Sequence, residues 1–181
     1  MAMSSTTGMT FSSDAAKDTY ISGLKNAHAL EKQAIQLMER QVERIENYPE
    51  VEQLLRGHIR ETEVQIRRLD EILHSFGEDR SLLKDMATQV TANLGAIAHS
   101  VMPDEILKNH FANHAFENYE IAAYESLIAM AEATGHGQHV SALRATLGEE
   151  EKMARTLREM TADLSLKYIR LYEQGVMQAK A

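Results

Sequence analysis

The stretch ENYEIAAYESL, residues 117–127, places acidic residues on the same helical stripe as apolar ones. Glu117, Glu120, Tyr124 and Leu127 follow one another at steps of three and four, which is the period of an α-helix. Two carboxylates one turn apart on a buried face are costly unless a positive group or water meets them. The stretch therefore predicts a long helix with a polar site on its inner side, and another part of the chain must supply the partner.

The same period predicts the other elements. Apolar stripes predict long helices at about 14–46, 49–76, 103–134 and 138–164, with a shorter helix at 83–101. The short connection ending at Pro49 makes the first two helices antiparallel neighbours. Two hairpins joined by a long connection predict an all-α four-helix bundle whose crossover carries a fifth helix. We expect disorder over residues 1–12, the bundle over 13–165 and a helical extension over 166–181.

Composition agrees with this fold and excludes several functions. The 181 residues include only two prolines and no tryptophan, which favours long helices over many strands and turns. The absence of cysteine excludes thiolate ligands and fits a reducing compartment. A net charge of −8 disfavours nucleic acid and anionic membranes as partners. With no secretory signal and no run long enough to span a membrane, we expect a cytoplasmic protein.

Each of the four long predicted helices has a glutamate in its apolar stripe: Glu31, Glu61, Glu120 and Glu150. Glu31 and Glu61 are 30 positions apart, and so are Glu120 and Glu150. Four inward carboxylates would repel one another unless a cation binds between them. Oxygen ligands with some imidazole favour iron or manganese, with zinc or magnesium as alternatives. Carboxylates can also bridge two such ions.

The histidines depart from the Glu-x-x-His pattern usual in di-metal bundles. The one such spacing, Glu71 to His74, falls on a polar face. The reverse order, His-x-x-Glu, occurs three times, at His28–Glu31, His58–Glu61 and His114–Glu117. His58 is a candidate ligand, and the alternative is a hydrogen-bonded core histidine. Tyr124 is a candidate redox-active residue beside the site, although tyrosines often only fill a bundle core.

Four blocks of the chain resemble the ferritin-like superfamily and, within it, the bacterial YciF/YciE stress-protein family. The blocks are LEKQ at 30–33, HIRETEVQIRRLD at 58–70, YEIAAYESL at 119–127 followed by AEATG, and TLGEE at 146–150. They occur in the family's order and span most of the chain from about residue 18 to residue 164. The match is specific because it combines four blocks.

The resemblance implies a ferritin-like bundle, often dimeric, with a di-metal centre and a stress-associated role. Carried over by position, the metal ligands are Glu31, Glu61, Glu120 and Glu150, with His58, Gln65 and Glu117 close enough to join them. Two positions depart from the family pattern. Asn118 stands where a histidine is expected, and Ala154 stands where an aspartate often follows the last acid by one turn. The missing aspartate weakens the expectation of a second metal position.

Two functions follow as hypotheses. The first is a di-metal protein, most simply di-iron, that reacts with O2 or peroxide as a ferroxidase or a peroxide scavenger, with manganese or zinc as alternatives. The second is a non-catalytic helical stress module that acts by dimerisation or partner binding and retains a degenerate metal site. Whether the chain is an enzyme stays open between them. For either hypothesis we expect a homodimer.

Overall fold

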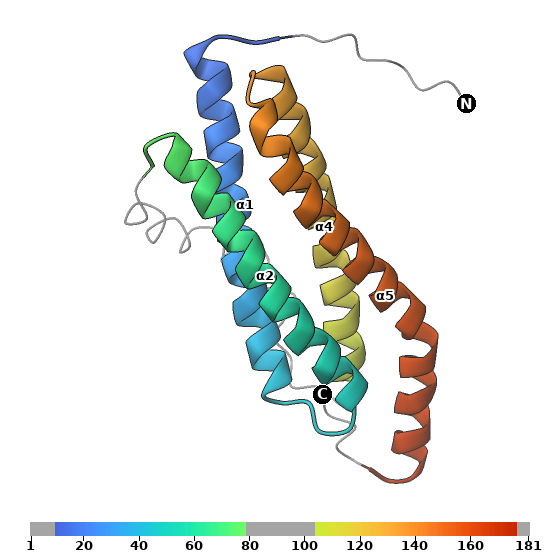
Figure 1. The fold of residues 1–181 in the computed structure, drawn as a ribbon. Coiled ribbons are helices and arrows are strands. Elements are labelled where there is room, and N and C mark those ends of the chain that lie inside the picture. The colour runs from blue at the N-terminus through green and yellow to red at the C-terminus, as the bar shows by residue number, and fades with distance from the viewer. Residues whose placement is uncertain (1–9, 79–103, 177–181) are drawn as a thin grey trace, which may run out of the picture.

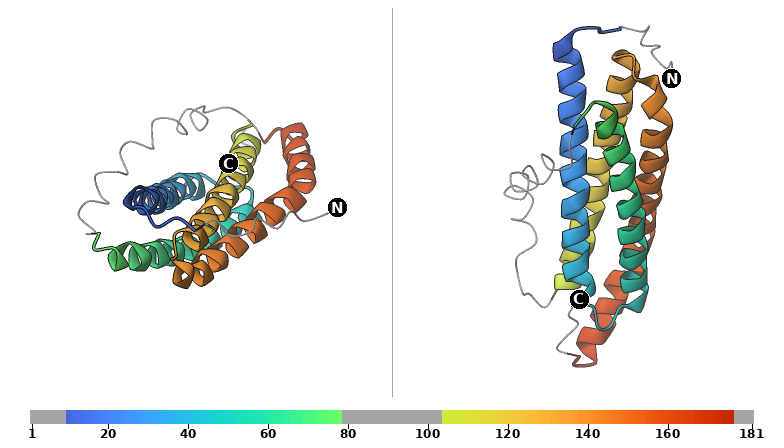
Figure 2. Two further views of the ribbon diagram at one scale, coloured as in Figure 1. Left: turned by 90° about the horizontal axis from the view of Figure 1, so that it is seen from above. Right: turned by 60° about the vertical axis from the view of Figure 1, so that its left-hand side comes forward.

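The computed structural model describes residues 10–78 and 104–176, which form a bundle of long α-helices. The elements are α1 (Asp14–Val42), α2 (Pro49–Ser75), α4 (Glu105–Ala133), the short 3-10 helix η2 (Gly137–His139) and α5 (Val140–Glu173). Helices α1 and α2 form one antiparallel hairpin, and α4 and α5 form the other (Figure 1). The hairpins pack through α1 against α4 and α2 against α5, so all four helices enclose one interior (Figure 2).

Local sequence signals set the helix ends. The Ser13 side chain accepts a hydrogen bond from the backbone N–H of Ala16 and so caps the start of α1. Pro49 occupies the first turn of α2, where its missing N–H has no consequence. Gly77 and Gly135 follow α2 and α4 with φ of 78° and 77°, in the left-handed region that glycine adopts without a steric penalty.

The apolar core is divided into two clusters along the bundle axis. One cluster joins the N-terminal parts of α1 and α5 to the C-terminal parts of α2 and α4, through Tyr20, Leu24, Leu69, Leu73, Leu127 and Leu143. The other joins the opposite halves of the same helices, through Met38, Val42, Leu55, Ile106, Leu157 and Leu164. Between them, each helix contributes buried polar side chains. This division places a polar layer at mid-height with apolar packing above and below it.

The prediction of an all-α four-helix bundle is confirmed. Helix α5 continues without a break through the boundary that we predicted at residue 165 and ends at Glu173, beyond the tip of the α1–α2 hairpin (Figure 1). The predicted fifth helix at 83–101 lies outside the described residues. So do most of the predicted disordered start and the last five residues.

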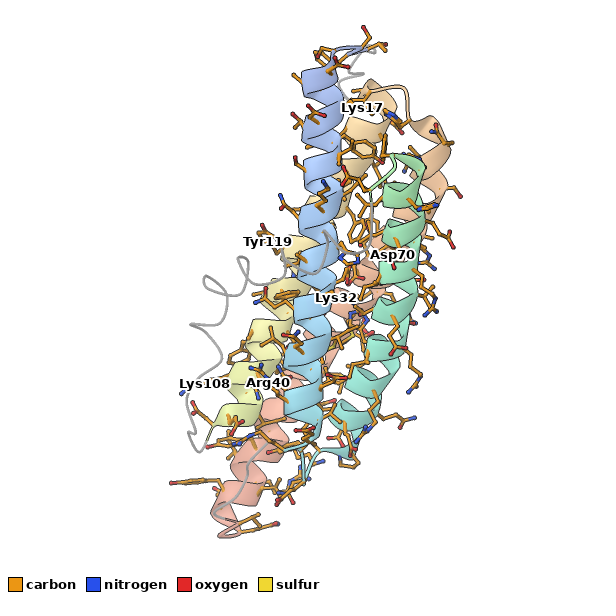
Figure 3. The ribbon with its side chains drawn as sticks, turned by 90° about the vertical axis from the view of Figure 1, so that its left-hand side faces the viewer. Lys17, Lys32, Arg40, Asp70, Lys108 and Tyr119 are labelled. Carbon is orange, nitrogen blue, oxygen red and sulfur yellow. The ribbon has the colours of Figure 1, made fainter. Side chains whose placement is uncertain are left out.

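Charged side chains cover the outside of the bundle. Lys32 and Arg40 project from the outer face of α1, while Glu31, next to Lys32 in sequence, is buried (Figure 3). Among the helices that the structure describes, none has the length and apolar character needed to cross a membrane.

Candidate metal centre

The polar layer between the two apolar clusters consists of seven side chains from four helices. They are Glu31 of α1, His58, Thr62 and Gln65 of α2, Glu117 and Glu120 of α4, and Glu150 of α5, and each is at most 3% exposed. On every helix these residues continue the stripe of the apolar core, so packing of the core turns them inward. Glu117 and Glu120, which the sequence places on one helical stripe, lie in a shared buried site.

His58 lies closest to two of the carboxylates. Its Nε2 atom is 3.3 Å from Glu117 Oε2 and 3.5 Å from Glu150 Oε2. The ligand atoms of these three residues all lie within 4.8 Å of one another. One imidazole nitrogen and two carboxylate oxygens from three helices thus converge on one small volume, as in a metal site of mixed nitrogen and oxygen ligands.

The pKa values of Glu117 and His58 are both raised above their ordinary values, so both side chains tend to hold a proton. Burial raises the pKa of the Glu117 carboxyl to about 8, although the neighbouring His58 opposes the rise. Burial alone would lower the pKa of His58, but the carboxylates of Glu117 and Glu150 raise it to about 11. In the absence of a metal, an imidazolium therefore supplies the positive charge that the buried acids require.

Glu31 and Glu120 complete the carboxylate cluster. The Tyr124 hydroxyl donates a hydrogen bond of 2.5 Å to Glu31 Oε1. The pKa of Glu31 is raised well above its usual value, mainly by burial and then by the charge of Glu150. The pKa of Glu120 is raised in the same way by burial, with Glu31 and Glu150 as the next contributions. The four acids act on one another electrostatically and so form one cluster.

A second set of polar residues fixes the position of Glu150. Gln65 donates a hydrogen bond to Glu150 Oε1 and another, of 3.1 Å, to Glu149 Oε2. Arg68 donates to both oxygens of Glu149, at 2.7 and 2.9 Å. The family resemblance indicates Gln65, whereas the sequence analysis does not identify Arg68 or Glu149. Their signal was available, because Arg68 follows Gln65 by three positions and Glu149 precedes Glu150.

The prediction that Glu61 faces the interior is wrong. Its side chain is 38% exposed and lies 3.3 Å from Lys152 Nζ and 3.4 Å from His58 Nδ1. The residue that continues the inward stripe one turn after His58 is Thr62, which is fully buried. Glu61 therefore lies at the edge of the site, between His58 and solvent, and its role as a metal ligand stays a prediction.

Four further histidines lie away from the trio. His28 is buried, and its Nε2 is 3.1 Å from Asp70 Oδ1, which explains its inward position without a metal. His114 is only half-buried and lies near Asn118. His74 is exposed, as the polar phase of its neighbours predicted. His110 is a buried histidine that we missed, although it precedes Glu117 by seven positions and so shares its stripe; its Nε2 is 3.0 Å from Thr161 Oγ1.

The residues present fit a metal ion. Across the described part of the chain, three buried carboxylate oxygens in this cluster have no hydrogen-bond partner of acceptable geometry: Glu117 Oε2, Glu120 Oε1 and Glu150 Oε2. Unpaired buried oxygens are unusual in folded proteins, and a bound cation would satisfy them. Ala154, at the expected aspartate position, is buried without offering a ligand. The buried side chains that could supply metal donors are the trio His58, Glu117 and Glu150, with Glu31 and Glu120 beside them.

Comparisons with known proteins agree with the fold and the sequence blocks. A family model described as "Domain of unknown function (DUF892)" matches residues 15–170. The chain belongs to the DUF892 family. Within it, the chain is similar to protein YciF of Escherichia coli strain K12, with 28% identity over 142 residues that cover 75% of this chain and 83% of YciF. This agrees with the family that the sequence blocks had indicated.

Two solved structures show the same fold. A protein from Xanthomonas campestris pv. campestris matches with a TM-score of 0.73 and 24% identity, covering 88% of this chain and 99% of that one. The E. coli stress protein YciF matches with a TM-score of 0.65 and 22% identity, covering 87% and 99%. At these identities the similarity shows that this chain shares the fold of the two proteins. The chemistry of its site follows from the residues of this chain.

Proposed function

We propose that this DUF892 protein binds redox-active metal in its carboxylate cluster and reacts there with O2 or peroxide, in protection against stress. The observation that supports the proposal is the set of three unpaired buried oxygens on Glu117, Glu120 and Glu150, beside the nitrogen of His58. Iron in a dinuclear centre suits these oxygen-rich donors, and manganese is the redox-active alternative, whereas zinc would occupy the site without this redox reaction. The 28% sequence identity to E. coli YciF, which is called a stress protein, supports the biological setting.

His58, Glu117 and Glu150 would hold one metal position, and Glu31 and Glu120 are the donors for a second. Bound iron would supply the electrons that reduce O2 or peroxide. The protein's own residues bind and orient: Gln65 fixes Glu150, and the Tyr124 hydroxyl fixes Glu31. The apolar clusters pack on both sides of this layer along the bundle axis.

The test is metal content per chain after anaerobic reloading of untagged protein with Fe(II). We expect close to two irons per chain in the wild type and a loss of at least one in Glu150→Gln or Glu31→Gln. Glu63→Gln is the matched control, because Glu63 is exposed on α2 and should keep the full metal content. Iron-loaded protein should then consume peroxide faster than the Glu150→Gln variant.

A second candidate function is supported by His58 itself. Since the His58 imidazolium already lies beside Glu117 and Glu150, the cluster is neutralised in part without metal. The chain would then be a non-catalytic helical module with a degenerate site, and the loss of the aspartate at Ala154 favours this. Failure of wild-type protein to retain any metal after reloading would support this candidate and contradict the first.

We also propose a cytoplasmic homodimer. Large apolar side chains are exposed on two helices, namely Phe111 and Tyr119 of α4 and Leu166, Ile169 and Tyr172 of α5. Such side chains are more frequent at interfaces than on solvated surfaces. Light scattering coupled to gel filtration should give twice the 20.4 kDa chain mass. A monomer mass at micromolar concentration would contradict the dimer.

A further inference from the structure

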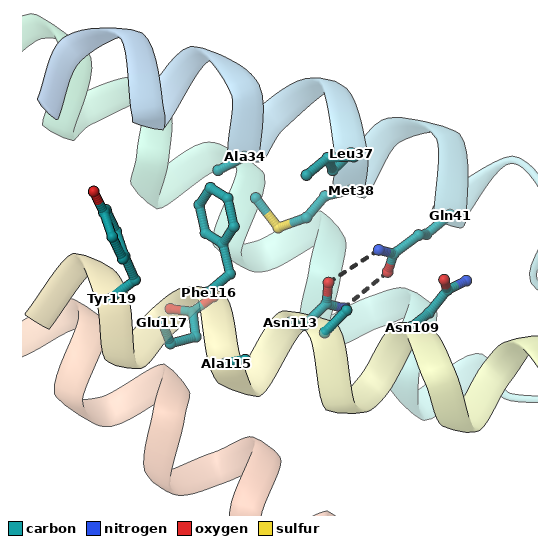
Figure 4. Close-up of a pocket in the computed structure, with 11 residues that line it drawn as sticks. Ala34, Leu37, Met38, Gln41, Asn109, Asn113, Ala115, Phe116, Glu117 and Tyr119 are labelled. Atoms are coloured by element: carbon teal, nitrogen blue, oxygen red, sulfur yellow. Dashed lines mark hydrogen bonds between the residues drawn. The ribbon is translucent and has the colours of Figure 1, made fainter. Parts of the chain in front are cut away.

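A cavity of about 140 Å³ lies between α1 and α4, on one side of the carboxylate cluster. In Figure 4 the rings of Phe116 and Tyr119 rise from α4 toward α1, and Met38 of α1 lies next to Phe116. Ala34 and Leu37 of α1 contribute further apolar wall. The small side chain of Ala34, where a larger residue would fill the space, leaves part of this volume open.

The far end of the cavity is lined by the polar side chains of Gln41 and Asn113, which already hydrogen-bond to each other. Gln41 and Asn113 exchange two hydrogen bonds, of 2.9 and 2.8 Å, which join α1 to α4 (Figure 4). No lysine or arginine is among the described residues that line the cavity. An anionic ligand would thus find no positive partner there, and burial of an unpaired charge is strongly unfavourable.

Glu117 also lines the cavity, and it belongs to the carboxylate cluster as well. Glu117 is 3% exposed, and its Oε2 lacks a hydrogen-bond partner among the described residues. The same oxygen is 3.3 Å from His58 Nε2. One buried side chain therefore borders both the cavity and the candidate metal centre. A hydroxyl group on a ligand would find a carboxyl oxygen that can accept a hydrogen bond at this wall.

We propose that the α1–α4 cavity binds a small neutral molecule with one apolar ring and one hydroxyl group, the class of the monocyclic phenols. The volume of the cavity is close to the roughly 150 Å³ of an apolar cavity that holds a benzene ring. Apolar walls of Ala34, Leu37, Met38 and Phe116 suit the ring. The inference that such a ligand is presented to a metal centre, as a reducing substrate beside Glu117, rests on the proposed function, whereas binding itself does not.

The test is titration of the metal-free, full-length protein with phenol, followed by NMR and calorimetry. We expect saturable binding with one site per chain. Benzoate, a ring of similar size that is anionic at neutral pH, should bind at least tenfold more weakly. Phenol should shift the imidazole signals of His58, because its site shares Glu117 with that histidine.

Two cavity variants locate the site. Ala34→Leu and Ala112→Leu each add volume to the lining and should weaken phenol binding at least tenfold. Ala122→Leu, an exposed position of α4 outside the cavity, is the matched control and should bind as the wild type does. Ala112 is only half-buried, so Ala112→Leu keeps the test valid if Ala34→Leu fails to fold.

The results separate this inference from the proposed function. Absence of saturable phenol binding, equal affinity for benzoate, or unchanged affinity in the folded cavity variants would overturn the cavity proposal, whatever metal the protein binds. Phenol binding without metal uptake would support the cavity and contradict the metal centre. Phenol binding together with metal uptake that alters phenol affinity would support both, because coupled sites change one another's affinity by the same factor.

Discussion

Glu120 is the side chain whose burial has the clearest energetic consequence. It is 1% exposed, its Oε1 lacks a partner in the described structure, and burial with the charge of Glu31 raises its pKa well above the usual value. The isosteric change Glu120→Gln removes an ionisable group from a site that disfavours its charge. We expect metal-free Glu120→Gln to be more stable than the wild type at pH 8 by about 1–2 kcal/mol, since one pKa unit corresponds to about 1.4 kcal/mol.

This gain should shrink toward zero near pH 5, where the wild-type carboxyl already holds its proton. Urea unfolding of both proteins at pH 5 and pH 8, with a chelator present, measures the difference. Glu63→Gln is the control, because Glu63 is exposed and should change stability little at either pH. Equal or lower stability of Glu120→Gln at pH 8 would show that the cluster does not penalise this charge.

At the scale of the helices, α2 and α5 are joined by a polar link beside the site. Arg68 donates to both oxygens of Glu149 and, at 3.1 Å, to Thr146 Oγ1, while Gln65 donates to Glu149 and Glu150. Arg68 and Glu149 are about one quarter exposed, so solvent screens the pair only partly. The geometry is bidentate and therefore stronger than that of a typical surface ion pair.

We expect Arg68→Met to reduce the free energy of unfolding by about 1 kcal/mol and to weaken metal binding, because Gln65 and Glu150 lose a fixed neighbour. Arg67→Met is the matched control, since Arg67 is exposed on the same helix. Urea unfolding and metal titration of the two variants make the comparison. If Arg68→Met retained wild-type affinity for metal, the link would be structural only.

The helices themselves were predictable from sequence, because steps of three and four residues identify α1, α2, α4 and α5 over many turns. The phase was sufficient to place Glu31, Glu120 and Glu150 inside. It failed for Glu61, because a residue at the edge of a stripe is buried or exposed according to how closely the next helix approaches, and here Lys152 of α5 meets it at the surface. The periodicity of the sequence does not reveal how closely α5 approaches α2 at Glu61.

The arrangement of His58, Glu117 and Glu150 could not be predicted from sequence periodicity either. His58 was predicted as a candidate, but its contacts with Glu117 and Glu150 join residues 59 and 92 positions apart and depend on the packing of three helices. The cavity beside Glu117 was not predicted at all. It results from the small size of Ala34 opposite Phe116, which appears only once α1 and α4 are placed side by side.

For the whole molecule, the buried cluster makes stability depend on pH. The pKa of Glu117 is about 8 in the folded chain against an ordinary value of 4.5, so between these values the folded state binds more protons than the unfolded state. Stability therefore falls as pH rises through this window. His58 acts in the same direction: its pKa of about 11 gives stability that is present below about 6.5 and is lost as pH rises through 11.

We accordingly expect the metal-free protein to be most stable near pH 5 and to lose stability steadily up to pH 8, with a slope of at most about 1.4 kcal/mol per pH unit for each proton involved. Below pH 5 the trend should reverse, since Arg68 holds the pKa of Glu149 below its usual value despite partial burial and this stability is lost on protonation. Urea unfolding from pH 4 to pH 9 measures the curve. Stability that rises from pH 5 to pH 8 would contradict protonated buried carboxyls.

Metal binding should reverse the loss of stability at high pH, because the ion replaces the protons that the cluster otherwise holds. A ligand carboxyl such as Glu117 must release its proton before it binds metal, so affinity should rise by up to about tenfold per pH unit for each proton released between pH 6 and pH 8. Stabilisation by a bound ion grows with the logarithm of affinity, so the difference in melting temperature between Mn(II)-loaded and metal-free protein should widen over the same range.

Glu63→Gln should show the same widening, whereas Glu117→Gln should bind metal more weakly and with a smaller pH dependence. A difference that stays constant from pH 6 to pH 8 in the wild type would mean that any metal is bound without displacing these protons, and would place its ligands outside the trio of His58, Glu117 and Glu150.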